Sequence, residues 1–176
     1  HKDHHNWIPP LYGDEWVFFS EKKNKSFGHC DTALFLAYRE DALVGRIMGI
    51  IHRDYNREKD ENNARFNFLE AWDDREVIEA LVEAVAGWAR EKGTEKLVGP
   101  LAFSDKDPQG YLVEGYNEPM VIASHCNYKY ITDHLADMGF TKEIDLVVYK
   151  VPVPDETPEL YLKIAERAER NNPELS

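Results

Sequence analysis

The chain has 176 residues, a usual length for one domain that buries its own hydrophobic core. Apolar residues make up 43% of it and charged residues 31%, so the composition is that of a globular protein and not of a disordered or fibrous one. The formal net charge of −12 argues against a nucleic-acid partner, because a phosphate backbone is bound by a basic face.

The sequence shows no targeting or membrane-spanning pattern. It contains neither a signal-peptide pattern nor an apolar run of the length that a bilayer requires. We therefore expect a cytoplasmic location and no membrane partner.

Each of the two cysteines follows a histidine, as His29-Cys30 and His125-Cys126. Zinc sites usually draw at least two ligands from one short segment, and two adjacent residues do not easily face one ion. We therefore expect reduced cysteines that pack in the protein, and no metal.

The first 31 residues predict an N-terminal extension with one helix. Residues 6–13 contain two prolines and predict an extended stretch. Asp14 follows this stretch and can cap a short helix that continues to about Asn24.

Two antiparallel strands are predicted next, over residues 32–38 and 42–52, with a turn at residues 39–41. Gly45 and Gly49 interrupt the second strand. Their spacing matches no phosphate-binding motif, so they indicate either a bulge or a close approach of another backbone. Residues 53–63 are polar and predict a loop.

A strand over residues 64–69 leads through an acidic turn into a helix that ends at Gly93. The turn, residues 70–76, has four carboxylates and no glycine, which argues against a phosphate site there. Asp73 and Glu76 predict a capping box. The apolar residues recur on one helical face, at Val77, Ile78, Leu81, Val82, Val85 and Trp88.

The second half of the chain predicts a short buried strand over residues 96–102, parallel to the preceding strand. A long loop follows over residues 103–124, and a loop of this length is often functional. A helix over residues 127–138 and a strand over residues 143–151 complete a core of residues 32–152. Four tyrosines of the loop and the helix either line a cleft or pack the loop: Tyr111, Tyr116, Tyr128 and Tyr130.

Residues 153–176 predict a linker and an amphipathic helix, residues 158–170, that leads out of the domain.

The order of these elements resembles the GNAT superfamily of N-acetyltransferases between about Thr32 and Val151. The late helix that ends in Gly139-Phe140 before a strand is similar to that family's late helix. More narrowly, residues 98–105 and 127–130 are similar to uncharacterised bacterial GNAT-like proteins, in which such a segment begins a longer chain. The resemblance implies an α+β fold with a GNAT-like mixed, mainly antiparallel sheet flanked by helices. It also implies a possible second domain after Ser176.

The resemblance implies an N-acyltransferase that moves an acyl group from acetyl-CoA or another acyl-CoA to an amine, on a small molecule or a peptide. The family holds the CoA pyrophosphate on a glycine-containing turn at the start of the central helix. Glu76 and Ile78 stand where two of those glycines would be, so the CoA loop is degenerate. The alternative is a non-catalytic domain of a tandem protein, with a structural or substrate-presenting role.

Candidate site residues follow from the same resemblance. The family's general-acid tyrosine falls on Leu135, which leaves Tyr130 and His134 as nearby alternatives. Candidate bases are Glu70, Glu114 and His134. The backbone of residues 68–71 would polarise the thioester carbonyl. The implied cofactor contacts are Phe68, Leu69, Ala71, Asp74, Arg75 and Asn127.

Overall fold

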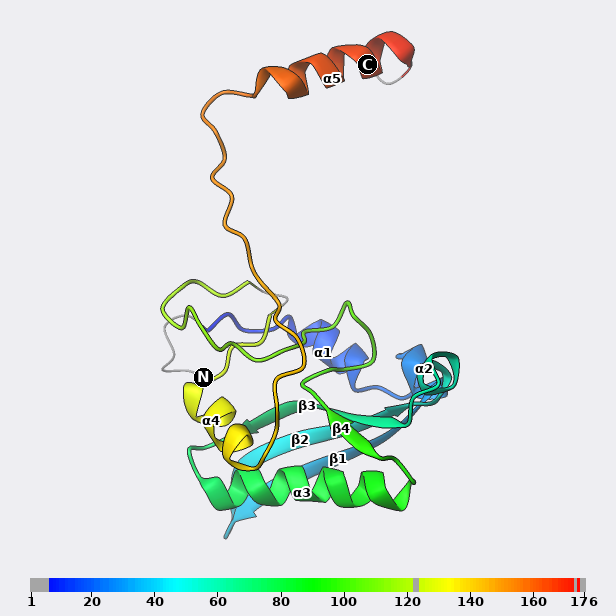
Figure 1. Ribbon diagram of the computed structural model, residues 1–176, viewed down its shortest axis with the longest axis vertical. Coiled ribbons are helices and arrows are strands. Elements are labelled where there is room, and N and C mark those ends of the chain that lie inside the picture. Colours follow the sequence, from blue (N-terminus) through cyan, green and yellow to red (C-terminus); the bar gives the residue numbers. More distant parts are fainter. Residues whose placement is uncertain (1–6, 122–123, 173, 175–176) are drawn as a thin grey trace. The chain divides into compact units, whose positions relative to one another are not determined.

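The computed structural model describes residues 7–121, 124–172 and 174 (Figure 1). These residues divide into two compact units, with the boundary between residues 143 and 144. Among the described residues, none of the helices combines the length and the apolar character that crossing a bilayer requires.

The first unit is built on a four-stranded mixed sheet with the order β1-β2-β3-β4. The strands are β1 (Cys30–Arg39), β2 (Ala42–His52), β3 (Asn63–Ala71) and β4 (Lys96–Val98). Antiparallel pairing joins the first three strands, and β4 pairs parallel to β3. The predicted α+β fold with a mixed, mainly antiparallel sheet is therefore confirmed.

Helix α3 (Arg75–Glu91) connects the two parallel strands and lies along one face of the sheet (Figure 1). Its buried residues repeat with helical spacing, as predicted, and Gly93 follows its end with a φ of +82°. The predicted cap is wrong by one residue. Asp74, not Asp73, is the N-cap, and its Oδ1 accepts hydrogen bonds from the N–H groups of Glu76 and Val77.

Shorter helices flank this core. They are α1 (Tyr12–Phe18), the 3-10 helix η1 (Lys25–Gly28), α2 (Arg53–Lys59) and α4 (Lys129–Asp137). The prediction of a loop over residues 53–63 is wrong at its start. The His52 side chain caps α2 by accepting a hydrogen bond from Tyr55 N, and Asp60 ends the helix with a φ of +54°.

Apolar clusters cover both faces of the sheet. The α3 face holds Phe66, Ile78, Val85 and their neighbours, and the other face holds Met48, Ile50 and Phe103. Gly45 and Gly49 let α3 approach β2 closely. A Cβ atom at Gly45 would lie 2.8 Å from a methyl carbon of Leu81, and one at Gly49 would lie 2.9 Å from the Trp88 ring. A register shift between β1 and β2 leaves Val44, next to Gly45, as an extra residue of β2, so a bulge adjoins one of the two glycines.

The second unit contains helix α5 (Glu159–Asn171), as predicted, with an ion pair between Lys163 and Glu159 at 2.8 Å. The predicted strand over residues 143–151 is not formed in the described structure. Its apolar side chains are exposed, Tyr149 to 82%. An alternating pattern forms a strand only where a neighbouring strand supplies hydrogen bonds.

Candidate functional site

Strands β3 and β4 pair only over their first three residues, Asn63–Arg65 with Lys96–Val98. The chain then turns at Gly99-Pro100, where Leu101 N donates to Phe66 O at 2.9 Å. A Cβ atom at residue 99 would lie 2.5 Å from that same carbonyl oxygen, so the close approach requires glycine. Beyond this point the C-terminal half of β3 still pairs with β2 on one side, but on its other side it has loop residues as neighbours in place of a strand.

Strand β3 is kinked at Phe68, whose φ of +53° is in the left-handed region. This conformation costs a non-glycine residue about 1–2 kcal/mol, and such residues cluster at functional sites. The Asn67 side chain stabilises the kink because its Oδ1 accepts a hydrogen bond from Phe68 N at 2.7 Å. The Phe68 ring packs against Phe18 and Phe19, with ring centres 5.2 and 5.0 Å away.

Two tyrosine hydroxyls donate to β3 carbonyls beyond the kink. Tyr130 donates to Ala71 O at 2.7 Å, and Tyr111 donates to Leu69 O at 3.4 Å. Burial, together with the nearby Asp73 carboxylate, raises the pKa of Tyr130 to about 12. Burial raises the pKa of Tyr111 as well. Both hydroxyls therefore keep their protons at neutral pH.

An accessible ion pair lies at the kink. Arg46 Nε on β2 is 2.9 Å from Glu70 Oε2 on β3, and the two side chains are 37% and 41% exposed. The Arg46 guanidinium also lies 5.8 Å from the centre of the Phe68 ring. A carboxylate, a guanidinium and a protonated tyrosine thus gather around one irregular strand.

The loop after β4 is fixed by buried polar side chains. Asn127 accepts a hydrogen bond from Leu112 N at 2.7 Å and donates to Leu112 O at 3.2 Å. His125 Nε2 donates to Pro108 O at 3.1 Å, and its ring centre is 5.8 Å from that of Tyr111. Burial lowers the pKa of His125, so its imidazole is neutral at pH 7.

The N-terminus of α3 is occupied by the protein's own charges. Arg39 Nη2 lies 2.7 Å from Asp74 Oδ2 and 2.9 Å from Glu76 Oε2. Asp74 in turn accepts from the N–H groups that a bound phosphate would use. The hydrogen bond and charge of Arg39 lower the pKa of Asp74, so this carboxylate stays ionised. These residues do not fit the pyrophosphate of CoA.

The structure gathers part of the predicted site. Phe68, Leu69, Glu70, Ala71 and Tyr130 lie at the kink, as their hydrogen bonds and ion pairs show. In addition, His134 Nε2, one helical turn after Tyr130, donates to Asp73 Oδ1 at 3.1 Å, and the rings of Tyr128 and Tyr130 are stacked.

The other predicted residues have different surroundings. Glu114 is exposed in the loop after β4. Arg75 pairs with Glu79 at 2.6 Å, Asp74 caps α3, and Asn127 fixes the loop backbone. Among the cysteines, Cys30 is buried in the apolar cluster, which raises its pKa to about 11.

Sequence reasoning missed Arg46, Arg65 and Asn67. Each is a polar residue within an otherwise apolar predicted strand, and this was the signal that could have found them. Arg65 and Asn67 are buried, and both donate to carbonyls of the loop after β4, Ala102 O and Pro108 O. They therefore connect the kinked strand to that loop.

Comparisons with known proteins give two relatives. Over 156 residues, 88% of its length, the chain is 30% identical to a protein from Caulobacter vibrioides named bacterial ceramide synthase. The match covers 41% of that protein. The chain is 28% identical over 147 residues, 84% of its length, to the protein YghO of Escherichia coli, of which the match covers 37%. The chain thus spans about two fifths of the length of these curated relatives. No protein-family model and no solved structure matches it.

Proposed function

We propose that this chain is a GNAT-like domain of an N-acyltransferase, which transfers an acyl group from an acyl-CoA to an amine. The observation that carries the proposal is the similarity, over 88% of the chain, to a protein named bacterial ceramide synthase. A ceramide is an amide of a fatty acid and a long-chain amino alcohol, so its synthesis forms an N-acyl bond. The order of strand, helix and parallel strand in the sheet supports the GNAT-like part of the proposal.

The chemistry needs a proton acceptor and a proton donor. When an amine attacks an acyl thioester, a C–N bond forms, the C–S bond breaks, and one proton passes from nitrogen to sulfur. Glu70 is an accessible carboxylate that can accept the proton from the amine. The Tyr130 hydroxyl, which keeps its proton up to a pH of about 12, can donate one to the leaving thiolate.

A second candidate function is favoured by the N-terminus of α3. Arg39, Asp74 and Glu76 already satisfy each other where a CoA pyrophosphate would bind. On this observation the domain is a non-catalytic part of a longer protein and presents the amine substrate. If another part of a longer protein bound the CoA phosphates, both candidate functions would be compatible with the similarity to the ceramide synthase.

A thermal-shift and calorimetric titration of the 176-residue chain tests the proposal. CoA and octanoyl-CoA are the ligands, and ATP is the control for unspecific phosphate binding. A ligand at one hundred times its dissociation constant stabilises a fold by about 2.7 kcal/mol, which is a visible shift in Tm. Binding of octanoyl-CoA but not of ATP supports the acyltransferase. No binding of either CoA compound contradicts acyl-CoA binding by this domain and supports the substrate-presenting alternative.

Glu76→Gly provides the converse test at the α3 N-terminus. It removes one carboxylate and leaves the Arg39 pair with Asp74 in place. If charge alone closes this end of the helix, the variant binds CoA more tightly than the parent chain does. The corresponding change at Ile78 is unsuitable, because that side chain is completely buried in the core and its loss would destabilise the fold.

A further inference from the structure

In the part of the chain that the structure describes, strand β1 is an edge strand with an open outer side, because the sheet order is β1-β2-β3-β4. Its ten residues, Cys30–Arg39, include no lysine and no proline. The register shift near its end places the extra residue, Val44, in β2, so β1 itself is regular. Natural edge strands are usually protected by charge, proline, a bulge or shortness. Strand β1 lacks these protections between Thr32 and Tyr38, so it is suited to pairing with another strand.

Apolar surface flanks the open edge on both faces of the sheet. On the face away from α3, Leu34 is 59% exposed and Leu36 is 55% exposed. On the α3 face, a groove of about 440 Å³ runs between β1 and the helix. The residues that line it are mainly apolar, and include Phe35, Ala37, Val77, Ala80 and Ala84. A strand paired to β1 would cover both surfaces.

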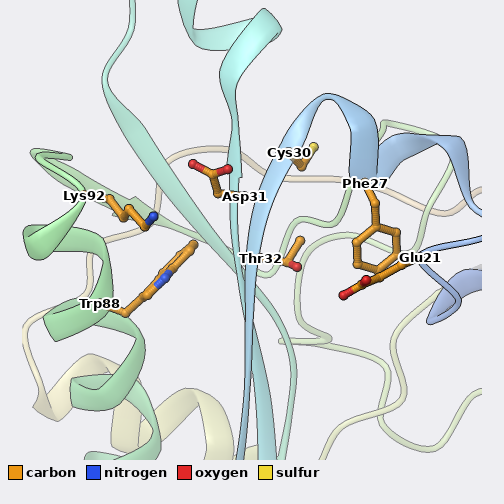
Figure 2. Close-up of a pocket in the computed structure, with 7 residues that line it drawn as sticks. All are labelled: Glu21, Phe27, Cys30, Asp31, Thr32, Trp88 and Lys92. Carbon is orange, nitrogen blue, oxygen red and sulfur yellow. The ribbon is translucent and has the colours of Figure 1, made fainter.

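A second hollow, of about 410 Å³, lies at the other end of the same edge. Figure 2 shows Trp88 of α3 and Lys92, which caps the C-terminus of α3, on the same side of β1 as Asp31, with Thr32 on the opposite side. At the opposite end of the edge, Arg39 and Glu76 border the groove between β1 and α3. Each end of the edge therefore has both an acidic and a basic side chain, with the acidic one on β1 at the first residues of the strand and the basic one on β1 at its last residue.

These charges are arranged so that two antiparallel copies complement each other. Along β1, Asp31 and Arg39 are equally distant from Phe35. Within one copy Asp31 pairs with Arg53, and Arg39 pairs with Asp74 and Glu76, so a contact with a second copy would add to these pairs. Along α3 and its C-cap, the lining residues recur every fourth position, from Glu76 through Ala80, Ala84 and Trp88 to the cap residue Lys92. A two-fold axis at Phe35 brings Asp31 towards Arg39 of the second copy, and Glu76 towards Lys92. A parallel arrangement would instead bring like charges together, which is unfavourable.

From this complementarity we propose that two copies of this chain form a symmetric dimer through antiparallel pairing of their β1 strands. The two sheets then continue into one sheet of eight strands, four from each copy. Leu34 of one copy lies opposite Leu36 of the other, and the Phe35 side chains fill the grooves that Ala80 and Ala84 leave open. Such an interface is isologous, as in most symmetric dimers. The kink in β3 takes no part in it, whereas Arg39 and Glu76 belong both to this interface and to the N-terminus of α3 considered above.

Sedimentation equilibrium of the 176-residue chain tests the dimer directly. The chain is measured from about 1 to about 200 µM, since association depends on concentration through mass action. We expect the mass to rise from 20.4 kDa towards twice that value. A mass that stays at 20.4 kDa throughout overturns the proposal.

Leu36→Lys locates the interface on β1. It places an ammonium group against Leu34 of the second copy, and we expect the dimer to dissociate at least about tenfold more readily. Leu43→Lys is the matched control, because Leu43 is 52% exposed but lies on β2, away from the edge. The control should dimerise as the parent chain does. Equal effects of the two variants, or no effect of Leu36→Lys, would overturn pairing through β1.

Charge exchange tests the antiparallel orientation. Glu76→Lys and Lys92→Glu should each weaken the dimer, because each brings like charges together across the two-fold axis. The double variant restores opposite charges and should regain the parent affinity. Circular dichroism of each variant checks that α3 is intact. Weak dimerisation of a folded double variant would overturn the proposed orientation.

Discussion

The hydroxyl of Tyr130 on α4 donates to the carbonyl oxygen of Ala71, the last residue of β3, at 2.7 Å. This single bond connects two segments that are 59 residues apart in the sequence. It also holds a protonated hydroxyl beside the kinked strand, close to the Glu70 ion pair. Helix α4 thus has a positioning role at the candidate site, besides the contribution of Ile131 and Leu135 to the core.

Tyr130→Phe should reduce the free energy of unfolding by about 0.5–1.5 kcal/mol, the usual net contribution of one hydrogen bond. The ring remains, so its stacking on Tyr128 and its packing are kept. Urea unfolding followed by circular dichroism measures the loss. Tyr38→Phe is the control, because the Tyr38 residue is 58% exposed and should change stability by less than about 0.5 kcal/mol. Equal stability of Tyr130→Phe and the parent would show that the bond to Ala71 contributes nothing.

The kink itself depends on Asn67. Asn67→Ala removes the acceptor for Phe68 N and the donor to Pro108 O, both in a completely buried position. We expect a loss of about 1–3 kcal/mol, since an unsatisfied buried donor costs its desolvation free energy. The measurement is urea unfolding with Asn117→Ala, in an exposed loop position, as the control. A loss no greater than that of the control would mean that the left-handed conformation of Phe68 needs no such support.

The elements that the sequence predicted well are those specified by local patterns. Helix α3 has apolar residues at helical spacing, a carboxylate cap and a terminal glycine, so both its position and its buried face were predictable. The predicted N-cap was one residue too early because Asp73 and Asp74 are adjacent and have the same side chain. The alternating pattern of residues 143–151 predicted a strand, but pairing depends on a neighbour that a local pattern does not specify.

The candidate site was less predictable because it is made by contacts distant in sequence. The left-handed φ of Phe68 depends on a hydrogen bond from its own N–H to Asn67 and on a loop residue, Pro108, that holds the other end of that amide. Tyr111 reaches Leu69 from 42 positions away. The hydrophobic periodicity of the sequence does not predict such contacts. The acidic turn argued against a phosphate site, and in the structure two of its carboxylates, Asp74 and Glu76, pair with Arg39, a contact that the local pattern did not reveal.

Two glycines provide a matched pair of tests for the packing of α3 on β2. Gly49→Ala should destabilise the fold by about 1–3 kcal/mol, because its Cβ atom would overlap the Trp88 ring and overpack the core. Gly87→Ala should stabilise it by up to about 1 kcal/mol, because Gly87 is helical and its added Cβ atom has free space. Thermal unfolding of both variants gives the comparison. Changes of the same sign would contradict the close approach of helix and strand at Gly49.

His125 should make the stability of the fold depend on pH on the acid side. Burial lowers its pKa below the usual 6.5, so the unfolded chain binds a proton at this position at a higher pH than the folded chain does. Its stabilising contribution is therefore complete above pH 6.5 and is lost as the pH falls through the folded pKa. His125→Gln cannot bind this proton, so its stability should fall less steeply with acid than that of the parent chain. Urea unfolding between about pH 5 and about pH 8 measures the two slopes, and an NMR titration of the imidazole gives the folded pKa. Identical acid slopes, or an imidazole that titrates above 6.5, would mean that the folded protein does not keep this ring neutral.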